Sequence, residues 1–176
     1  MVPLGKIGTM SQDTFLYFAY GSNMLGQRMR ARTPSAQRVA LATLPDFELR
    51  WHKVSRDGSG KCDIVTQPGG TVHGVLYEIA AGERPALDLA QGLGTGYRAV
   101  QLEVQTASGA RQALSYQATN IDSFTKPYSW YKALVVAGAR EQQLDAAYIA
   151  ALEAAPSWED PDSQRAADNL RQLGAA

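Results

Sequence analysis

Alternating apolar and polar positions dominate the first two thirds of the chain and predict a series of short β-strands. The first strand, residues 14–20, is rich in aromatic side chains and runs into a Gly-Ser-Asn turn. Further strands are expected at residues 38–44, 47–52, 61–66, 72–79, 97–106 and 111–119. Glycine-rich segments between them, at 56–60, 68–70 and 108–109, are typical of loops and turns.

Apolar residues recur at helical spacing near both ends of the chain and once in the middle. Ser22 or Asn23 is a suitable N-cap for the first helix, and Thr33-Pro34 would end it. No repeat and no long linker divides the sequence. Strands in the centre with helices mostly at the ends predict an α+β fold around one β-sheet or barrel. The helices are expected at residues 24–32, 82–90, 128–140, 141–154 and 162–173.

The composition indicates one ordinary globular domain. The chain has 176 residues, with 17 Lys+Arg against 17 Asp+Glu, so its formal net charge is zero. A balanced chain has no overall basic field to hold nucleic acid or an anionic membrane, so neither partner is expected. With one cysteine and two histidines, a zinc site of nitrogen and sulfur ligands is not expected either.

The single cysteine, Cys62, allows no intrachain disulfide. This fits the reducing cytoplasm, although a secreted protein without disulfides has the same composition. No apolar run approaches the roughly 20 residues that a membrane-spanning helix needs. Residues 1–12 are interpreted as an N-terminal extension or leader, with Met10 as an alternative start, and residues 13–176 as the domain.

The segment Tyr20-Gly21-Ser22-Asn23-Met24 joins a strand directly to a helix start. Backbone N–H groups in such a turn have no intrahelical partners and lie at the positive end of the helix dipole. They form a site that suits a carboxylate or phosphate, and Gly21 would let the ligand approach the backbone closely. The same pattern also fits an ordinary capped turn that binds nothing.

Five segments, in consistent order between residues 15 and 154, resemble the γ-glutamylcyclotransferase family with its AIG2-like fold, in particular its bacterial members. They are FLYFAYGSNM (15–24), GSGKCD (58–63), VHGVLY (72–77), GLGTGY (92–97) and YSWYKAL (128–134). The resemblance implies a small twisted mixed β-barrel flanked by helices, acting without a cofactor as a monomer or homodimer.

The resemblance also implies a small-molecule γ-glutamyl substrate. In the family, the α-amine of the γ-glutamyl unit attacks its own γ-amide carbonyl, which gives 5-oxoproline and releases an amine or amino acid. Tyr97 and Tyr131 match aromatic positions that shape the family's pocket, although core packing is an equally ordinary role for a tyrosine. The substrate-binding residues carried over from the turn are Tyr20, Gly21, Ser22, Asn23 and Met24.

Gln91 occupies the position of the family's catalytic glutamate, in the register set by Leu87-Asp88 and Gly92. An amide is close to a carboxylate in shape but does not act as a base near neutral pH. Three explanations remain open: deliberate inactivation that traps a substrate, a homologue that binds without cyclising or runs other chemistry, and another carboxylate that does the work. Candidates for that carboxylate are Asp88, Glu103, Glu78 and Asp63, of which Asp63 is expected to be structural and Glu103 to face solvent.

Other notable residues have ordinary interpretations. Arg28, Arg30 and Arg32 are expected on a solvated helix face, and Lys61 at a solvated strand end. Cys62 is expected to be a buried inert thiol. The stripe of Trp130, Tyr131 and Leu134 is expected in the core. Two alternatives to an impaired cyclotransferase also remain, a non-catalytic γ-glutamyl-binding protein and a biosynthetic enzyme that removes a γ-glutamyl protecting group.

Overall fold

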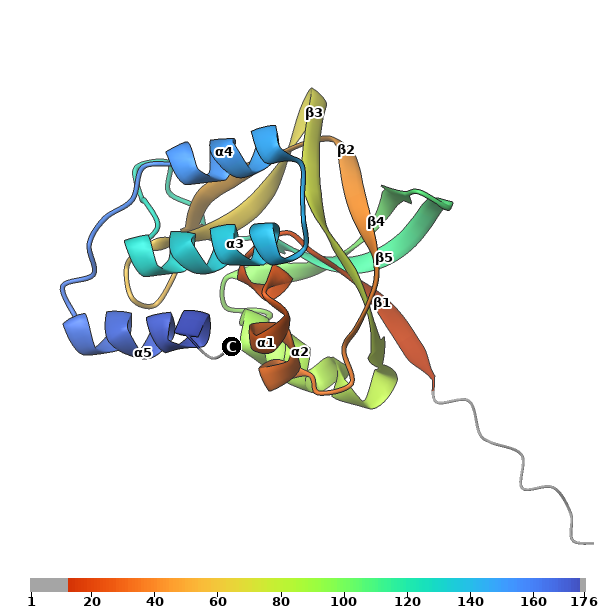
Figure 1. The fold of residues 1–176 in the computed structure, drawn as a ribbon, viewed down its shortest axis with the longest axis horizontal. Helices are drawn as coiled ribbons and strands as arrows, with labels where there is room; N and C mark the ends of the chain where they lie inside the picture. The colour runs from red at the N-terminus through yellow and green to blue at the C-terminus, as the bar shows by residue number, and fades with distance from the viewer. Residues whose placement is uncertain (1–12, 175–176) are drawn as a thin grey trace, which may run out of the picture.

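A closed five-stranded barrel forms the centre of the computed structural model, which describes residues 13–174 (Figure 1). The strand order is β1-β3-β2-β4-β5. β1 is antiparallel to β3 and closes the barrel by a parallel pairing with β5, where Tyr17 lies opposite Leu114. This mixed barrel with flanking helices confirms the predicted α+β fold. The strands span Thr14–Ala19 (β1), Gln37–Val54 (β2), Gly60–Ala80 (β3), Tyr97–Thr106 (β4) and Gly109–Ala118 (β5).

Two of these strands are much longer than predicted. The expected strands at 38–44 and 47–52 are one strand, β2, and those at 61–66 and 72–79 are one strand, β3. The register shifts between Pro45 and Phe47, where Asp46 has a φ of 62°. The N–H of Gly69 donates to Asp46 Oδ1 at 3.0 Å across this point. The turn signals therefore mark a bulge that bends a continuous hairpin, rather than the ends of strands.

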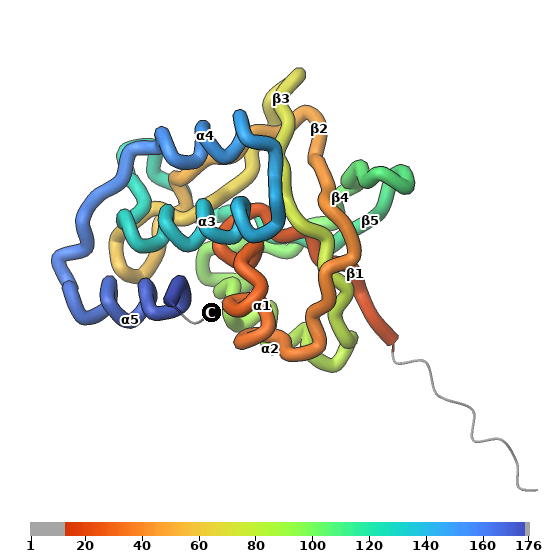
Figure 2. The backbone as a smooth tube through the Cα atoms, in the orientation of Figure 1, coloured from red at the N-terminus to blue at the C-terminus, as the bar shows by residue number. Residues whose placement is uncertain are grey.

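The helices gather on one side and at one end of the barrel (Figure 1). α3 and α4 pack together, α5 lies against α3, and α1 lies beside α2 (Figure 2). Their bounds are Gly26–Arg32 (α1), Arg84–Gln91 (α2), Ser129–Glu141 (α3), Ala146–Ala154 (α4) and Ser163–Gly174 (α5), with 3-10 turns at Ser22–Met24 and Ala81–Glu83.

The start of the first helix differs from its prediction. A 3-10 turn precedes α1, and the residue before α1 is Leu25, so the prediction that Ser22 or Asn23 caps this helix is wrong. The predicted helix at 141–154 is also shorter, because Gln143 has a φ of 59° and α4 begins only at Ala146. The hydroxyl of Ser22 and the side-chain amide of Asn23 are therefore available to bind other partners.

The core fills the barrel and continues under α3. Trp130, Tyr131 and Leu134 are buried, as predicted. Within residues 13–174, no helix is long and apolar enough to cross a membrane. The predicted extension at residues 1–12 lies outside the described part of the chain.

Candidate functional site

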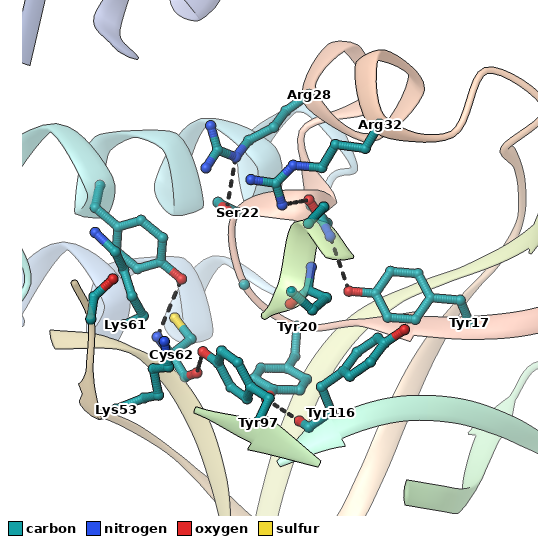
Figure 3. Close-up of a pocket in the computed structure, with 16 residues that line it drawn as sticks. Tyr17, Tyr20, Ser22, Arg28, Arg32, Lys53, Lys61, Cys62, Tyr97 and Tyr116 are labelled. Atoms are coloured by element: carbon teal, nitrogen blue, oxygen red, sulfur yellow. Dashed lines mark hydrogen bonds between the residues drawn. The ribbon is translucent and has the colours of Figure 1, made fainter. Parts of the chain in front are cut away.

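A cavity of about 210 Å³ opens at the end of the barrel where β1 runs into the Gly-Ser-Asn turn (Figure 3). Its walls come from this turn, from α1, from the facing ends of β2 and β3, and from α2, β4, β5 and α3. Segments distant in sequence therefore meet at one place. Seven of the eight residues predicted from sequence line this cavity: Tyr20, Gly21, Ser22, Asn23, Gln91, Tyr97 and Tyr131.

Met24 is the exception among the predicted residues. Its side chain is fully buried, and its backbone N–H donates to the carbonyl of Gly21 at 3.1 Å. The N–H groups of Gly21, Ser22 and Asn23, by contrast, make no hydrogen bond to any residue that the structure describes. Adjacent unbonded N–H groups at a cavity wall can receive an anion.

Two arginines of α1 lie over this turn, although they were predicted on a solvated face (Figure 3). Arg28 Nε donates to Ser22 Oγ at 3.0 Å, and Arg32 Nη1 donates to Asn23 Oδ1 at 2.8 Å. The two arginines are four residues apart and so share one face of the short helix. Arg30, on the other side, is exposed as predicted. Ser22 and Asn23 therefore hold the arginines instead of capping the helix.

Burial lowers the pKa of Arg28 to about 10, and repulsion from Arg32 adds to this effect. Burial also lowers the pKa of Arg32. Within residues 13–174, neither guanidinium has a carboxylate within 4.0 Å. A pair of half-buried cations without an anionic partner is costly, and an anionic ligand would relieve that cost.

Two lysines from the hairpin of β2 and β3 face the arginines across the cavity (Figure 3). Lys61 was predicted at a solvated strand end, but its ammonium lies 4.4 Å and 4.5 Å from the ring centroids of Trp130 and Tyr131. It also donates to Asp57 Oδ2 at 3.2 Å. Lys53 lies 4.8 Å from the ring centroid of Tyr97. Burial lowers the pKa of both lysines.

Tyrosine hydroxyls connect the cavity floor to the backbone of Cys62. Tyr97 donates to the Cys62 carbonyl at 2.5 Å, and the Tyr131 hydroxyl accepts from the Cys62 N–H at 3.2 Å. Burial raises the pKa of Tyr97 and Tyr131 well above the ordinary value, so both hydroxyls stay protonated. Burial likewise raises the pKa of the Cys62 thiol to about 12. This supports the prediction of an inert thiol, since the thiolate is the reactive form.

Gln91 is the last residue of α2, where the chain turns towards the cavity. Gly92 follows it with a φ of 70°, a conformation that glycine adopts without strain. The side chain of Gln91 is half-buried, and it also lines a second cavity of about 400 Å³ that adjoins the first. Gln91 thus stands where two adjoining cavities meet.

None of the residues that line the first cavity is an aspartate or glutamate. Asp63 is buried beneath the floor, where it bonds to His52 Nε2 at 2.7 Å and to the N–H of Ala118 at 2.7 Å. Its structural role is therefore as predicted. Glu103 is exposed, also as predicted, and Glu78 accepts from Thr14 on the outside of the barrel.

Asp88 is connected to the cavity through the side chain of Tyr116. Its Oδ1 accepts from the hydroxyl of Tyr116, a lining residue, at 2.5 Å and from Arg84 Nε at 2.8 Å. Among the predicted alternative carboxylates, it is the one whose side chain is hydrogen-bonded to a residue that lines the cavity. Among residues 13–174, no three His, Cys, Asp or Glu side chains gather in a way that could hold a metal ion.

Comparison with known proteins identifies relatives of this chain. Residues 71–152 match the model of the AIG2-like family. The chain is 35% identical over 155 residues to the gamma-glutamylcyclotransferase of Mus musculus, which covers 81% of this chain and 79% of the mouse protein. It is 33% identical over 156 residues to that of Homo sapiens, with 81% and 79% covered. A solved structure named gamma-glutamyl cyclotransferase superposes with a TM-score of 0.82 at 31% identity, over 91% of this chain and 99% of that one.

Proposed function

Because this chain belongs to the γ-glutamylcyclotransferase family, we propose that it binds the γ-glutamyl group of an amide or dipeptide and cyclises it only weakly. The products would be 5-oxoproline and a free amine or amino acid. The observation that carries this proposal is the wall around the Gly-Ser-Asn turn, which combines unbonded N–H groups, two arginines and Gln91 without any acidic side chain.

The α-carboxylate of the γ-glutamyl unit is assigned to the turn. It would accept hydrogen bonds from the N–H groups of Gly21, Ser22 and Asn23, close to Arg28 and Arg32. Each hydrogen bond to an ionised group contributes a net stabilisation of about 1.5–3 kcal/mol. The tyrosines of the cavity floor would then lie along the carbon chain of the substrate, and the γ-amide would point towards Gln91.

The reaction needs little chemistry from the protein. The α-amine nitrogen attacks the γ-carbonyl carbon, a carbon–nitrogen bond forms within a five-membered ring, and the original amide carbon–nitrogen bond breaks. One proton leaves the attacking amine, and one proton is added to the departing nitrogen. Holding the amine against the carbonyl accounts for most of the acceleration, since good positioning contributes roughly 7–11 kcal/mol.

Proton transfer is the step that Gln91 impairs. A carboxylate at this position would take the amine proton and return it to the leaving nitrogen, a contribution of about 10²–10⁴-fold. The amide of Gln91 can donate and accept hydrogen bonds, so substrate binding is retained. The expected phenotype is therefore tight binding with slow turnover.

Two other functions use the same cavity. A non-catalytic γ-glutamyl-binding protein would show the binding and no turnover at all. A biosynthetic enzyme that removes a γ-glutamyl protecting group would show turnover, and the contact between Asp88 and Tyr116 offers it a route for protons. Asp88→Asn separates these cases, because it would abolish any turnover that depends on this route and would leave a pure binder unchanged.

The proposal is tested by calorimetric titration of this chain with two isomers, γ-L-glutamyl-L-alanine and α-L-glutamyl-L-alanine. Both carry the same charges, but only the γ-isomer places a free α-amine and α-carboxylate at the turn. We expect the γ-isomer to bind at least about tenfold more tightly, which corresponds to about 1.4 kcal/mol. Equal affinity for the two isomers would contradict the assignment of the turn, and no binding of either would contradict the function.

A further inference from the structure

The helix α5 runs along α3 and ends beside α1 (Figure 2). None of the residues of α5 is buried. Its half-buried side chains include Arg165, Asn169 and Gln172, which recur about once per helical turn and so share one face. A helix that docks through an apolar face would bury a stripe of apolar residues. The attachment of α5 therefore depends largely on polar contacts.

Asp160 fastens the start of α5 to α3. Its carboxylate accepts from Trp130 Nε1 at 2.8 Å and from Arg165 Nε and Nη2 at 2.7 Å and 2.6 Å. The hydrogen bonds from Arg165 hold the pKa of this carboxyl well below its usual range, so the pair stays charged near neutral pH. Two parallel hydrogen bonds between a guanidinium and a carboxylate are geometrically specific. The start of the helix is thus fixed, and the position of its last turn follows.

Gln172, in that last turn, connects α5 to the wall of the first cavity. Its Oε1 accepts from Arg28 Nη1 at 3.1 Å, while Arg28 Nε donates to Ser22 Oγ at 3.0 Å. Because the guanidinium is planar and rigid, two hydrogen bonds at different edges fix its orientation. Arg28 Nη2 donates to no residue that the structure describes, so it is free to donate to a ligand.

Both acceptors that hold Arg28 are neutral, one a hydroxyl and the other an amide. Arg32 is held in the same way, by the amide oxygen of Asn23 at 2.8 Å. A neutral acceptor orients a guanidinium without neutralising it, whereas a carboxylate would form an ion pair with it. The charge of Arg28 therefore remains available to an anion in the cavity.

We propose that Gln172 is a positioning residue for the binding of the substrate α-carboxylate: it orients Arg28 and leaves its charge free. The inference rests on the proposed function, which assigns this carboxylate to the turn beside Arg28. No residue of α5 lines the cavity, so Gln172 acts through Arg28 and does not touch the substrate. The helix α5 is then a functional part of the site.

The test compares γ-L-glutamyl-L-alanine with its α-carboxamide analogue, two ligands that differ only in the carboxylate assigned to the turn. Calorimetric titration of the unmodified chain should show tighter binding of the carboxylate ligand. In Gln172→Glu the ratio of the two affinities should fall about tenfold, because Arg28 is then paired within the protein. Ala167→Glu adds the same charge at an exposed position of α5 and should keep the ratio.

Gln172→Leu keeps the inference testable if the charged variant does not fold. Leucine is a good helix former but accepts no hydrogen bond, so Arg28 stays charged and loses one of its two anchors. The ratio should then fall about threefold, less than in Gln172→Glu. A purely structural role of Gln172 would lower both affinities equally, and an unchanged ratio in both variants would overturn the inference while leaving the proposed function intact. Failure of the unmodified chain to prefer the carboxylate ligand would instead overturn the assignment of the turn in the proposed function, and this inference with it.

Discussion

Replacement of Arg28 by methionine is expected to stabilise the free protein while weakening its binding of a carboxylate ligand. Burial, aided by Arg32, lowers the pKa of Arg28 from 12.5 to about 10. At about 1.4 kcal/mol per pKa unit, the folded state disfavours the charged side chain by roughly 3 kcal/mol. The variant is relieved of this cost, and its methionine stem still fills the space of the arginine chain.

The variant also loses two hydrogen bonds, which Arg28 donates to Ser22 at 3.0 Å and to Gln172 at 3.1 Å. Each is worth about 1 kcal/mol, so the net gain in the free energy of unfolding is about 1 kcal/mol. For a chain of this size that gain raises Tm by about 2–4 °C. Arg28 stays charged at neutral pH in the folded and the unfolded state, so the gain does not depend on pH near neutrality.

The assay is thermal unfolding followed by circular dichroism, with and without a saturating γ-glutamyl dipeptide. The unmodified chain should show the lower Tm alone and the larger rise on adding the dipeptide, because a ligand that binds only the native state stabilises it. Arg30→Met is the matched control, since Arg30 lies on the same helix but is exposed and does not line the cavity. A variant at Arg28 that melts lower than the unmodified chain yet keeps the full ligand-induced rise would refute the reasoning.

Three further predictions concern other parts of the site. Gly138→Ala puts a methyl carbon 2.6 Å from the backbone nitrogen of Leu25, so urea unfolding should show a free energy of unfolding lower by about 1–3 kcal/mol. An unchanged unfolding midpoint would contradict the tight packing of α3 on the turn. Because burial raises the pKa of Cys62 to about 12, iodoacetamide should alkylate the unfolded chain readily and the native chain barely; equal rates would contradict its burial. Burial acts to raise the pKa of Asp57, but hydrogen bonds from Ser59 together with the charge and hydrogen bond of Lys61 outweigh it and leave the pKa below 3.8. Asp57 thus contributes stability above that pH which is lost as the pH falls through its folded pKa, and acid titration of Asp57→Asn should show a smaller loss over this window.

The barrel and the turn could be predicted because their signals are local. The aromatic strand at residues 14–20 is followed directly by Gly21, and the later strands alternate clearly. The length of β2 and β3 could not be predicted, because Pro68-Gly69-Gly70 is read as a turn in a window of a few positions. Only the pairing of the two strands across the bulge shows that the hairpin continues through them.

The basic side chains of the site were the main failure of the sequence interpretation. Arg28 and Arg32 look like one half of a solvated helix face, and the helix they occupy is too short for a periodicity argument. Their spacing of four residues, directly after the turn, was the available signal. Lys53 and Lys61 carried no such signal, since what brings them together is the curvature of a long hairpin against α3.

The most direct test of the account is the rate of 5-oxoproline release from γ-L-glutamyl amino acids, measured for this chain and for Gln91→Glu. Gln67→Glu, which adds the same charge at an exposed site, serves as the control. We predict that Gln91→Glu releases 5-oxoproline about 10²–10⁴-fold faster than the unmodified chain and that the control does not. Equal rates for the unmodified chain and Gln91→Glu would contradict the assignment of Gln91 as the position of the proton-transferring group.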